Sequence, residues 1–113
     1  MAEGLIRRGD FVLAVAPGEY GKARPALVIQ SDLFDALPSV TLCPLTSLIR
    51  EDAGLLRITV QPLQDNGLRK ISQIAVDKIT TLPVSRLGGV IGRVDDELML
   101  RVTRALALFL GIS

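Results

Sequence analysis

Short apolar runs, each closed by glycine, proline or acidic residues, follow one another along most of the chain. Runs of this length are typical of buried strands, and strict alternation is typical of a strand with one exposed face. They predict strands over residues 11–16, 26–30, 40–45, 55–60, 68–76 and 78–82. Residues 31–37 favour one helical turn with Ser31 as its N-cap and Pro38 at its end. Asp65-Asn66-Gly67 predicts a tight turn, because Asn-Gly readily adopts positive φ.

A helical pattern is confined to the end of the chain. Asp95 is the expected N-cap, Asp96 and Glu97 follow where the helix dipole favours negative charge, and Gly111 closes the helix. One face carries Leu98, Val102, Ala105, Leu106 and Phe109 at helical spacing. A second apolar strip on the opposite face fits either packing against a partner subunit or a helix that is simply well buried: Leu100, Ala107 and Leu108. Residues 1–113 are therefore expected to form one mainly β domain with a C-terminal helix, a small and strongly bent antiparallel sheet or barrel.

The amino-acid composition excludes several classes of protein and several catalytic mechanisms. The chain has 113 residues, of which 49% are hydrophobic and 22% charged, so neither a disordered tail nor a fibrous repeat fits. Thirteen basic and 12 acidic side chains give a net charge of +1, which exerts no global pull on nucleic acid. There is no histidine and one cysteine, which excludes Ser-His-Asp and Cys-His catalysis and nearly every zinc site. Any catalysis must run without imidazole.

The sequence predicts a soluble, cytoplasmic protein without a metal site. Cys43 has no intramolecular partner, and no secretory signal follows the N-terminal arginines. The longest apolar stretch, residues 105–110, is far shorter than the roughly 20 residues that span a bilayer. The acidic groups follow no recognisable ligand spacing, so caps and solvated loops account for them.

Two short stretches carry candidate chemistry. In the first, a glycine-framed loop bearing Lys22 leads to Arg24 at the mouth of a strand, and Pro25 stiffens that mouth. A fixed guanidinium presents a planar fork of donors that suits two phosphate oxygens. In the second, the hydroxyls of Thr46 and Ser47 follow directly on a strand end. Taken singly, each stretch also fits a purely structural role: a salt bridge for the arginine and loop capping for the hydroxyls.

Taken together, the motifs of this sequence resemble the PemK/MazF family of toxin-antitoxin ribonucleases. The resemblance runs nearly the whole length and rests on the order of its motifs. These are Arg8-Gly9-Asp10, Arg24-Pro25-Ala26-Leu27-Val28, Pro44-Leu45-Thr46-Ser47, Ser72-Gln73-Ile74-Ala75-Val76-Asp77-Lys78-Ile79, Leu82 with Ser85-Arg86-Leu87-Gly88, and the helix end Leu110-Gly111-Ile112.

The resemblance implies an SH3-like barrel with a C-terminal helix, a symmetric homodimer and a metal-independent, cofactor-free endoribonuclease. Such toxins inhibit growth by cleaving single-stranded mRNA at short sequences, and an antitoxin neutralises them by laying an acidic tail in the RNA groove. The family's catalytic arginine before proline matches Arg24, and its threonine after the third strand matches Thr46. Ala75 stands where some members have an arginine.

Without histidine, the expected reaction is attack by the ribose 2′-hydroxyl on the adjacent phosphorus, which gives a 2′,3′-cyclic phosphate and a 5′-hydroxyl end. Either Glu19 or Asp77 could accept the proton, and Ser47 and Gln73 are further candidates for catalysis or groove contact. Tyr20 offers a stacking face for a base. The candidates for a backbone path are Lys22, Arg50, Arg69 and Lys70.

Two other functions use the same fold. A CcdB-like toxin poisons DNA gyrase with the end of its terminal helix, but residues 110–113 lack an aromatic anchor beside the glycine. The other alternative is a non-catalytic SH3-like binding module. Specific RNA cuts with cyclic-phosphate ends distinguish the ribonuclease from both.

Overall fold

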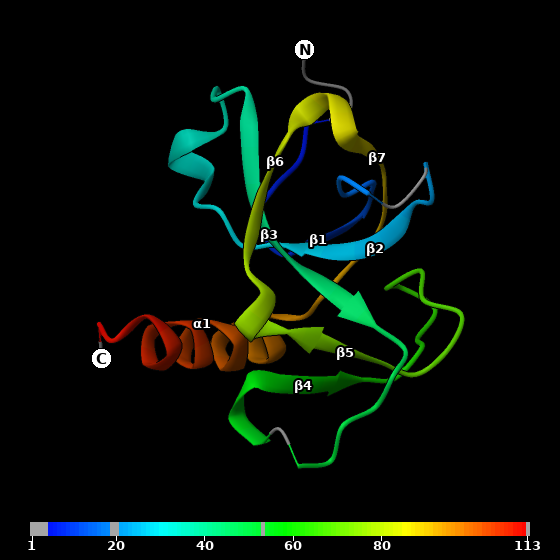
Figure 1. Cartoon of the computed structure of the whole chain (residues 1–113), viewed down its shortest axis with the longest axis vertical. Helices are drawn as coiled ribbons and strands as arrows, with labels where there is room; N and C mark the ends of the chain where they lie inside the picture. Colours follow the sequence, from blue (N-terminus) through cyan, green and yellow to red (C-terminus); the bar gives the residue numbers. More distant parts are fainter. Residues whose placement is uncertain (1–4, 19–20, 53, 113) are drawn as a thin grey trace.

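Seven strands and one α-helix form the part of the chain that the computed structural model describes, residues 5–18, 21–52 and 54–112. Short 3-10 turns join several of them (Figure 1). The strands are β1 (Asp10–Ala14), β2 (Arg24–Val28), β3 (Ser39–Thr46), β4 (Arg57–Val60), β5 (Ser72–Ala75), β6 (Thr80–Pro83) and β7 (Leu87–Arg93). The 3-10 turns are η1 (Asp32–Phe34), η2 (Gly54–Leu56), η3 (Val76–Lys78) and η4 (Val84–Arg86), and the helix is α1 (Asp96–Leu110).

All strand pairs are antiparallel, in the order β4-β5-β3-β2-β1-β7, with β6 on β3. The long strand β3 crosses the middle of the molecule in Figure 1 and holds the two parts of the sheet together. Its first half pairs with β6 and its last two residues pair with β5. The predicted mainly β fold with a C-terminal helix is therefore confirmed.

The sheet is bent and open, so the predicted barrel is corrected in this respect. Closure would require β4 to pair with β7, and no such pair occurs among the described residues. The connection between β4 and β5 packs against β7 instead. Arg93 donates its backbone N–H to the carbonyl of Asp65 at 3.1 Å, and Gly67 lies against the backbone of Ile91. This connection takes the place that a closing strand would need.

The core lies on both sides of the central strands. Alternate residues of β1 and β2 point to opposite faces, so Phe11 and Leu27 join one cluster while Val12 and Ala26 join the other. The first cluster includes the buried face of α1, and the second packs around Val40, Leu42 and Leu82. Burial on both faces explains why the strands read as continuous apolar runs.

The helix begins and ends as predicted. Asp95 accepts a hydrogen bond from the Leu98 N–H at 2.8 Å, and Gly111 closes the helix with a left-handed φ of 75°. Phe109 is 42% exposed at the helix end, whereas Val102 and Leu106 on the same face are buried. The second apolar strip is exposed on this chain at Leu100 and Leu108. Among the described residues, no helix is both long and apolar enough to cross a membrane.

Strand bounds in the second half differ from the prediction for local reasons. The expected strand 68–76 is formed only over Ser72–Ala75, because η3 interrupts the chain immediately afterwards. The expected strand 78–82 begins at Thr80. Gly88, Gly89 and Gly92, which the sequence leaves outside the expected strands, lie inside β7. At Gly92 the reason is steric, since a Cβ there would overlap the backbone of Asn66.

Candidate functional site

Arg24 is the first residue of β2 and lies at the solvent-exposed end of that strand. It pairs with Ala14 of β1 on one side. On the other side, Ala26 lies opposite Pro44 of β3, and continuing this antiparallel register by two residues sets Arg24 opposite Thr46. Directly opposed residues of an antiparallel pair project from the same face. The guanidinium and the threonine side chain therefore share one face at one edge of the sheet.

Thr46 is the last residue of β3, and its hydroxyl is oriented locally. Its Oγ1 accepts a hydrogen bond from the Leu48 N–H at 3.1 Å, which ties the side chain to the start of the following loop. A hydroxyl has one donor and two acceptor sites, so this bond leaves the O–H as a donor to another group. Ser47, the neighbouring candidate, is exposed in the same loop.

A shallow groove of about 330 Å³ runs from Arg24 across β2 and β3. Its floor is apolar and includes Ala14, Ala26, Leu42 and Pro44. Arg24 and Lys78 line it together with this floor. Lys78 belongs to η3 and comes to this face only through the fold. Sequence reasoning missed this lysine, because its spacing from Arg24 along the chain carries no signal.

Gln73 does not face the groove as a substrate-binding group would. It is 3% exposed on β5, where it lies opposite Thr46 of β3 and Thr59 of β4. Its Oε1 accepts from the Arg50 N–H at 3.0 Å, and its Nε2 donates to the Arg50 carbonyl and to Thr59 Oγ1, both at 3.2 Å. The amide of Gln73 thus joins Arg50 to Thr59, while the backbone register sets Gln73 opposite Thr46.

Asp77 is held by Arg57, a residue that sequence reasoning did not single out. Arg57 donates from Nε to Oδ1 at 2.8 Å and from Nη2 to Oδ2 at 3.1 Å, and its side chain is only 9% exposed. These charge-assisted hydrogen bonds lower the pKa of Asp77 below its ordinary value, against an opposing effect of burial. A carboxylate engaged at both oxygens is a weak proton acceptor.

The Arg57–Asp77 pair predicts a specific acid dependence of stability. Because the pKa of Asp77 is depressed in the folded state, its carboxylate stabilises the fold above about pH 4, and this stability is lost as the pH falls through the folded pKa. Asp77→Asn should therefore show a smaller decrease in the free energy of unfolding between pH 5 and pH 2 than the unmodified chain. Urea unfolding at each pH measures this difference, and equal decreases in the two proteins would refute the linkage.

Cys43 is a core residue. Burial raises the pKa of its thiol to about 12, and the charge of Asp77 adds to this shift. The thiolate is the reactive form of cysteine. At neutral pH Cys43 is therefore inert, as its position in an apolar strand predicts.

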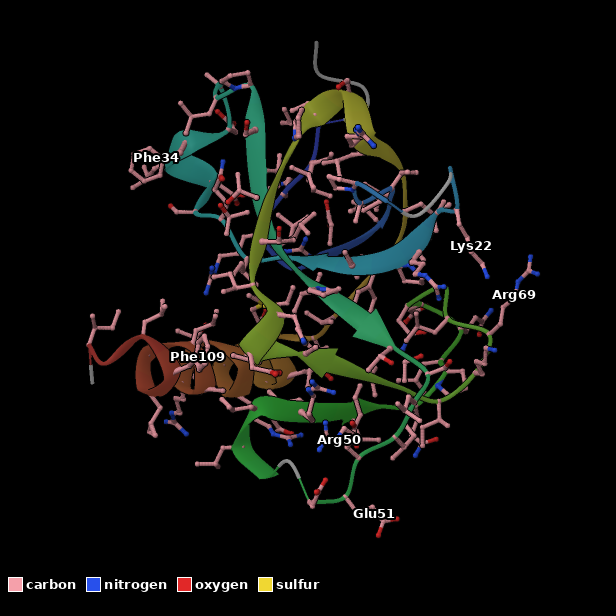
Figure 2. The ribbon with its side chains drawn as sticks, in the orientation of Figure 1. Lys22, Phe34, Arg50, Glu51, Arg69 and Phe109 are labelled. Atoms are coloured by element: carbon pink, nitrogen blue, oxygen red, sulfur yellow. The ribbon has the colours of Figure 1, made fainter. Side chains whose placement is uncertain are left out.

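The remaining predicted RNA contacts are spread over the surface. Lys22 and Arg69 project from the same edge of the molecule in Figure 2, while Arg50 lies lower, beside β4. The Arg50 guanidinium is half exposed, with its Nε 3.5 Å from Asp52 Oδ1. Lys70 is exposed, and its carbonyl accepts from Ser72 Oγ at 3.1 Å. Glu19 and Tyr20 lie outside the described residues.

These elements define a class of small bent-sheet domain in which an arginine at the start of one strand lines a groove and a threonine ends the neighbouring strand. This combination suits an anionic ligand with adjacent phosphate oxygens. Across the described parts of the chain, no three His, Cys, Asp or Glu side chains converge as a metal site would need.

Comparison with known proteins gives the family. Residues 7–110 match the family described as the PemK-like, MazF-like toxin of type II toxin-antitoxin systems. The chain belongs to this family. It is 48% identical over 109 residues to the probable endoribonuclease MazF of Mycolicibacterium smegmatis, which covers 96% of this chain and 99% of that protein. A gyrase poison and a non-catalytic binding module are not favoured by these matches.

Solved structures agree with this assignment of the fold. The Mycobacterium tuberculosis toxin MazF-mt6 superposes with a TM-score of 0.78 at 25% identity, over 92% of this chain and 98% of that one. An endoribonuclease from a mycobacterial species, solved in complex with its cognate antitoxin, superposes with a TM-score of 0.79 at 24% identity, over 96% and 97% of the two chains.

Proposed function

We propose that this chain is the toxin of a type II toxin-antitoxin system and an endoribonuclease that cleaves single-stranded mRNA without a metal ion. One observation carries the proposal: Arg24 lines the groove, and the β2–β3 register, continued by two residues, sets it opposite Thr46. The family match over residues 7–110 supports it, as does the relative named as a probable endoribonuclease. The whole chain is taken as one such domain.

In this mechanism the nucleophile belongs to the substrate. The ribose 2′-oxygen forms a bond to the adjacent phosphorus, and the bond from phosphorus to the 5′-oxygen breaks. The transition state gathers negative charge on the non-bridging oxygens. Arg24 stabilises that charge with its planar fork of donors, and Thr46 donates its O–H to the same phosphate. The products are a 2′,3′-cyclic phosphate and a 5′-hydroxyl end.

Two protons must move during this reaction. The 2′-hydroxyl proton passes to a base, and the leaving 5′-oxygen gains a proton, for which Arg24 is the proposed donor. Asp77 is engaged by Arg57 through both carboxylate oxygens, so it fits a structural role better than that of base. Glu19 stays the other candidate base, from the loop that precedes β2.

In the proposed complex the RNA strand follows the groove and the exposed cations outside it. Apolar residues on the groove floor suit splayed bases, as single-stranded recognition requires. Lys22, Arg69 and Lys70 supply exposed positive charge for the backbone, with Tyr20 as the stacking side chain. Because the net charge is only +1, binding depends on these local charges, and non-specific RNA binding should be weaker than for a strongly basic relative.

The proposed partners follow from the same family. A cognate antitoxin neutralises the toxin by laying an acidic segment in the groove beside Arg24, and the family description and the antitoxin-bound relative support such a partner. The chain works as a homodimer, supported by the exposed strip of Leu100 and Leu108 on α1. Its place of action is the cytoplasm, where mRNA is found.

The direct test is cleavage of a long single-stranded RNA by the purified chain in excess EDTA. We expect a fixed set of fragments whose pattern and yield are the same with and without EDTA. The same RNA annealed to its complement should stay intact, because a duplex does not splay its bases into the groove. Strict dependence on an added divalent ion would overturn the metal-independent mechanism, and an uncut RNA would overturn the proposed activity.

A further inference from the structure

One residue, Gln73, contacts both ends of the loop that follows β3. At one end, Thr46 lies opposite Gln73 in the β3–β5 register. At the other end, the side-chain amide of Gln73 pairs with both backbone groups of Arg50, accepting from its N–H at 3.0 Å and donating to its carbonyl at 3.2 Å. The segment 46–50 therefore forms a closed loop on β5.

The amide of Gln73 acts here as a peptide group would in a further strand. It presents one acceptor and one donor to one residue, as the backbone of a neighbouring strand does in an antiparallel pair. Its second N–H donates to Thr59 Oγ1 at 3.2 Å, which fixes the orientation of the amide. The side chain is 3% exposed, so water competes little for these bonds.

We infer that Gln73 is a positioning residue for RNA cleavage, acting through segment 46–50 without touching the substrate. This inference rests on the proposed ribonuclease function and deepens it. Holding Arg50 in place keeps the loop from pulling on Thr46, whose hydroxyl already depends on Leu48 for its orientation. It also presents the half-exposed guanidinium of Arg50 from a fixed backbone.

The chemistry of the clamp requires both a donor and an acceptor. Leucine fills a similar volume but provides neither, so both backbone groups of Arg50 would lose their partner. Glutamate is close in shape and keeps the acceptor for the Arg50 N–H. It then sets an anionic oxygen against the Arg50 carbonyl and lacks the N–H that reaches Thr59. Both substitutions should release the loop, by different routes.

The experiment compares Gln73→Leu and Gln73→Glu with Thr59→Val in the full chain. Thr59→Val removes only the bond that orients the amide and leaves both bonds to Arg50. We measure kcat and KM on a defined single-stranded RNA, together with hydrogen exchange at the Arg50 amide and the thermal midpoint. Misplacement by about 1 Å can cost on the order of 100-fold in rate. We expect kcat to fall about 10- to 100-fold in both Gln73 variants and less than about threefold in Thr59→Val.

The hydrogen-exchange data and the separate effects on kcat and KM distinguish a positioning role of Gln73 from a merely structural one. In a positioning role, the Arg50 amide exchanges faster and kcat falls while the protein stays folded at the assay temperature. The inference fails if both Gln73 variants keep the kcat of Thr59→Val, or if kcat falls with no change in exchange at Arg50. Absence of cleavage by the unmodified chain would refute the proposed function, whereas unchanged exchange at Arg50 in Gln73→Leu would refute the clamp.

Discussion

Replacing Arg24 by alanine should lower the rate of RNA cleavage by about 100- to 1000-fold. This is the usual cost of removing one preorganised donor from the charge that develops in a transition state. Arg24 is exposed at the start of β2, so its loss removes no core packing. Single-turnover cleavage of a defined RNA measures the effect, with circular dichroism and thermal melting to show that the fold persists.

Arg7→Ala is the matched control for this experiment. Arg7 is also an exposed arginine, but it precedes β1, near the Val28 end of β2, and does not line the groove that contains Arg24. Both variants lower the net charge equally, so a general electrostatic effect on RNA binding would appear in both. Cleavage by Arg24→Ala at the rate of Arg7→Ala would remove Arg24 from the mechanism.

Thr46→Val tests the second group acting on the same phosphate. Valine keeps the shape of the threonine and its preference for a strand, and it removes only the hydroxyl. If Arg24 and Thr46 stabilise one transition-state charge, their effects on the activation free energy are not additive. Removing one member of a unit already abolishes most of its contribution to the rate. The double variant should then cleave little more slowly than Arg24→Ala alone, in contrast to two independent losses that multiply.

A large effect on stability should come from Gly92→Ala in β7. A Cβ at this position would overlap the backbone of Asn66, which belongs to the connection that packs against β7. Overpacking usually costs about 1–3 kcal/mol, and a clash between two backbones belongs at or beyond the upper end. A small domain has only about 5–15 kcal/mol of stability in total.

Gly89→Ala provides the control within the same strand. Neither Gly89 nor Gly92 takes a left-handed φ, and a Cβ at Gly89 would meet no atom within 4 Å. Alanine at position 89 should change the unfolding free energy by less than about 0.5 kcal/mol, as at most surface sites. Thermal and urea unfolding of both variants measure the contrast, and equal stabilities would show that Gly92 is not held by close packing.

The strength of each sequence prediction reflects how local its physical cause is. The terminal helix was predictable at both ends, because its cap at Asp95 and its glycine at position 111 act within one turn. The η1 turn was predictable for the same reason, since Ser31 caps it by accepting from the Leu33 N–H. The open state of the sheet could not be predicted, because it depends on the contact between Gly67 and β7.

The candidate site shows the same difference between features with local causes and features that depend on long-range contacts. The positions of Arg24 and Thr46 at strand ends follow from the apolar runs beside them, so the sequence could place each at the end of its own strand. Pairings across strands could not be read in this way. Arg57 finds Asp77 at a separation of 20 residues, and Gln73 finds Arg50 at 23. Both pairs depend on the register between β4, β5 and the preceding loop, and residue spacing does not encode that register.

The measurement that bears most directly on the central claim is the chemistry of the cut ends, with a substrate altered at one atom. A synthetic RNA with one cleavage site is compared with the same RNA carrying a 2′-deoxyribose on the 5′ side of the scissile phosphate. If the substrate's own 2′-hydroxyl is the nucleophile, the first RNA gives a 2′,3′-cyclic phosphate and a 5′-hydroxyl end, and the second stays uncut. Cleavage of the deoxy substrate, or products with a 5′-phosphate, would contradict the mechanism assigned to Arg24 and Thr46.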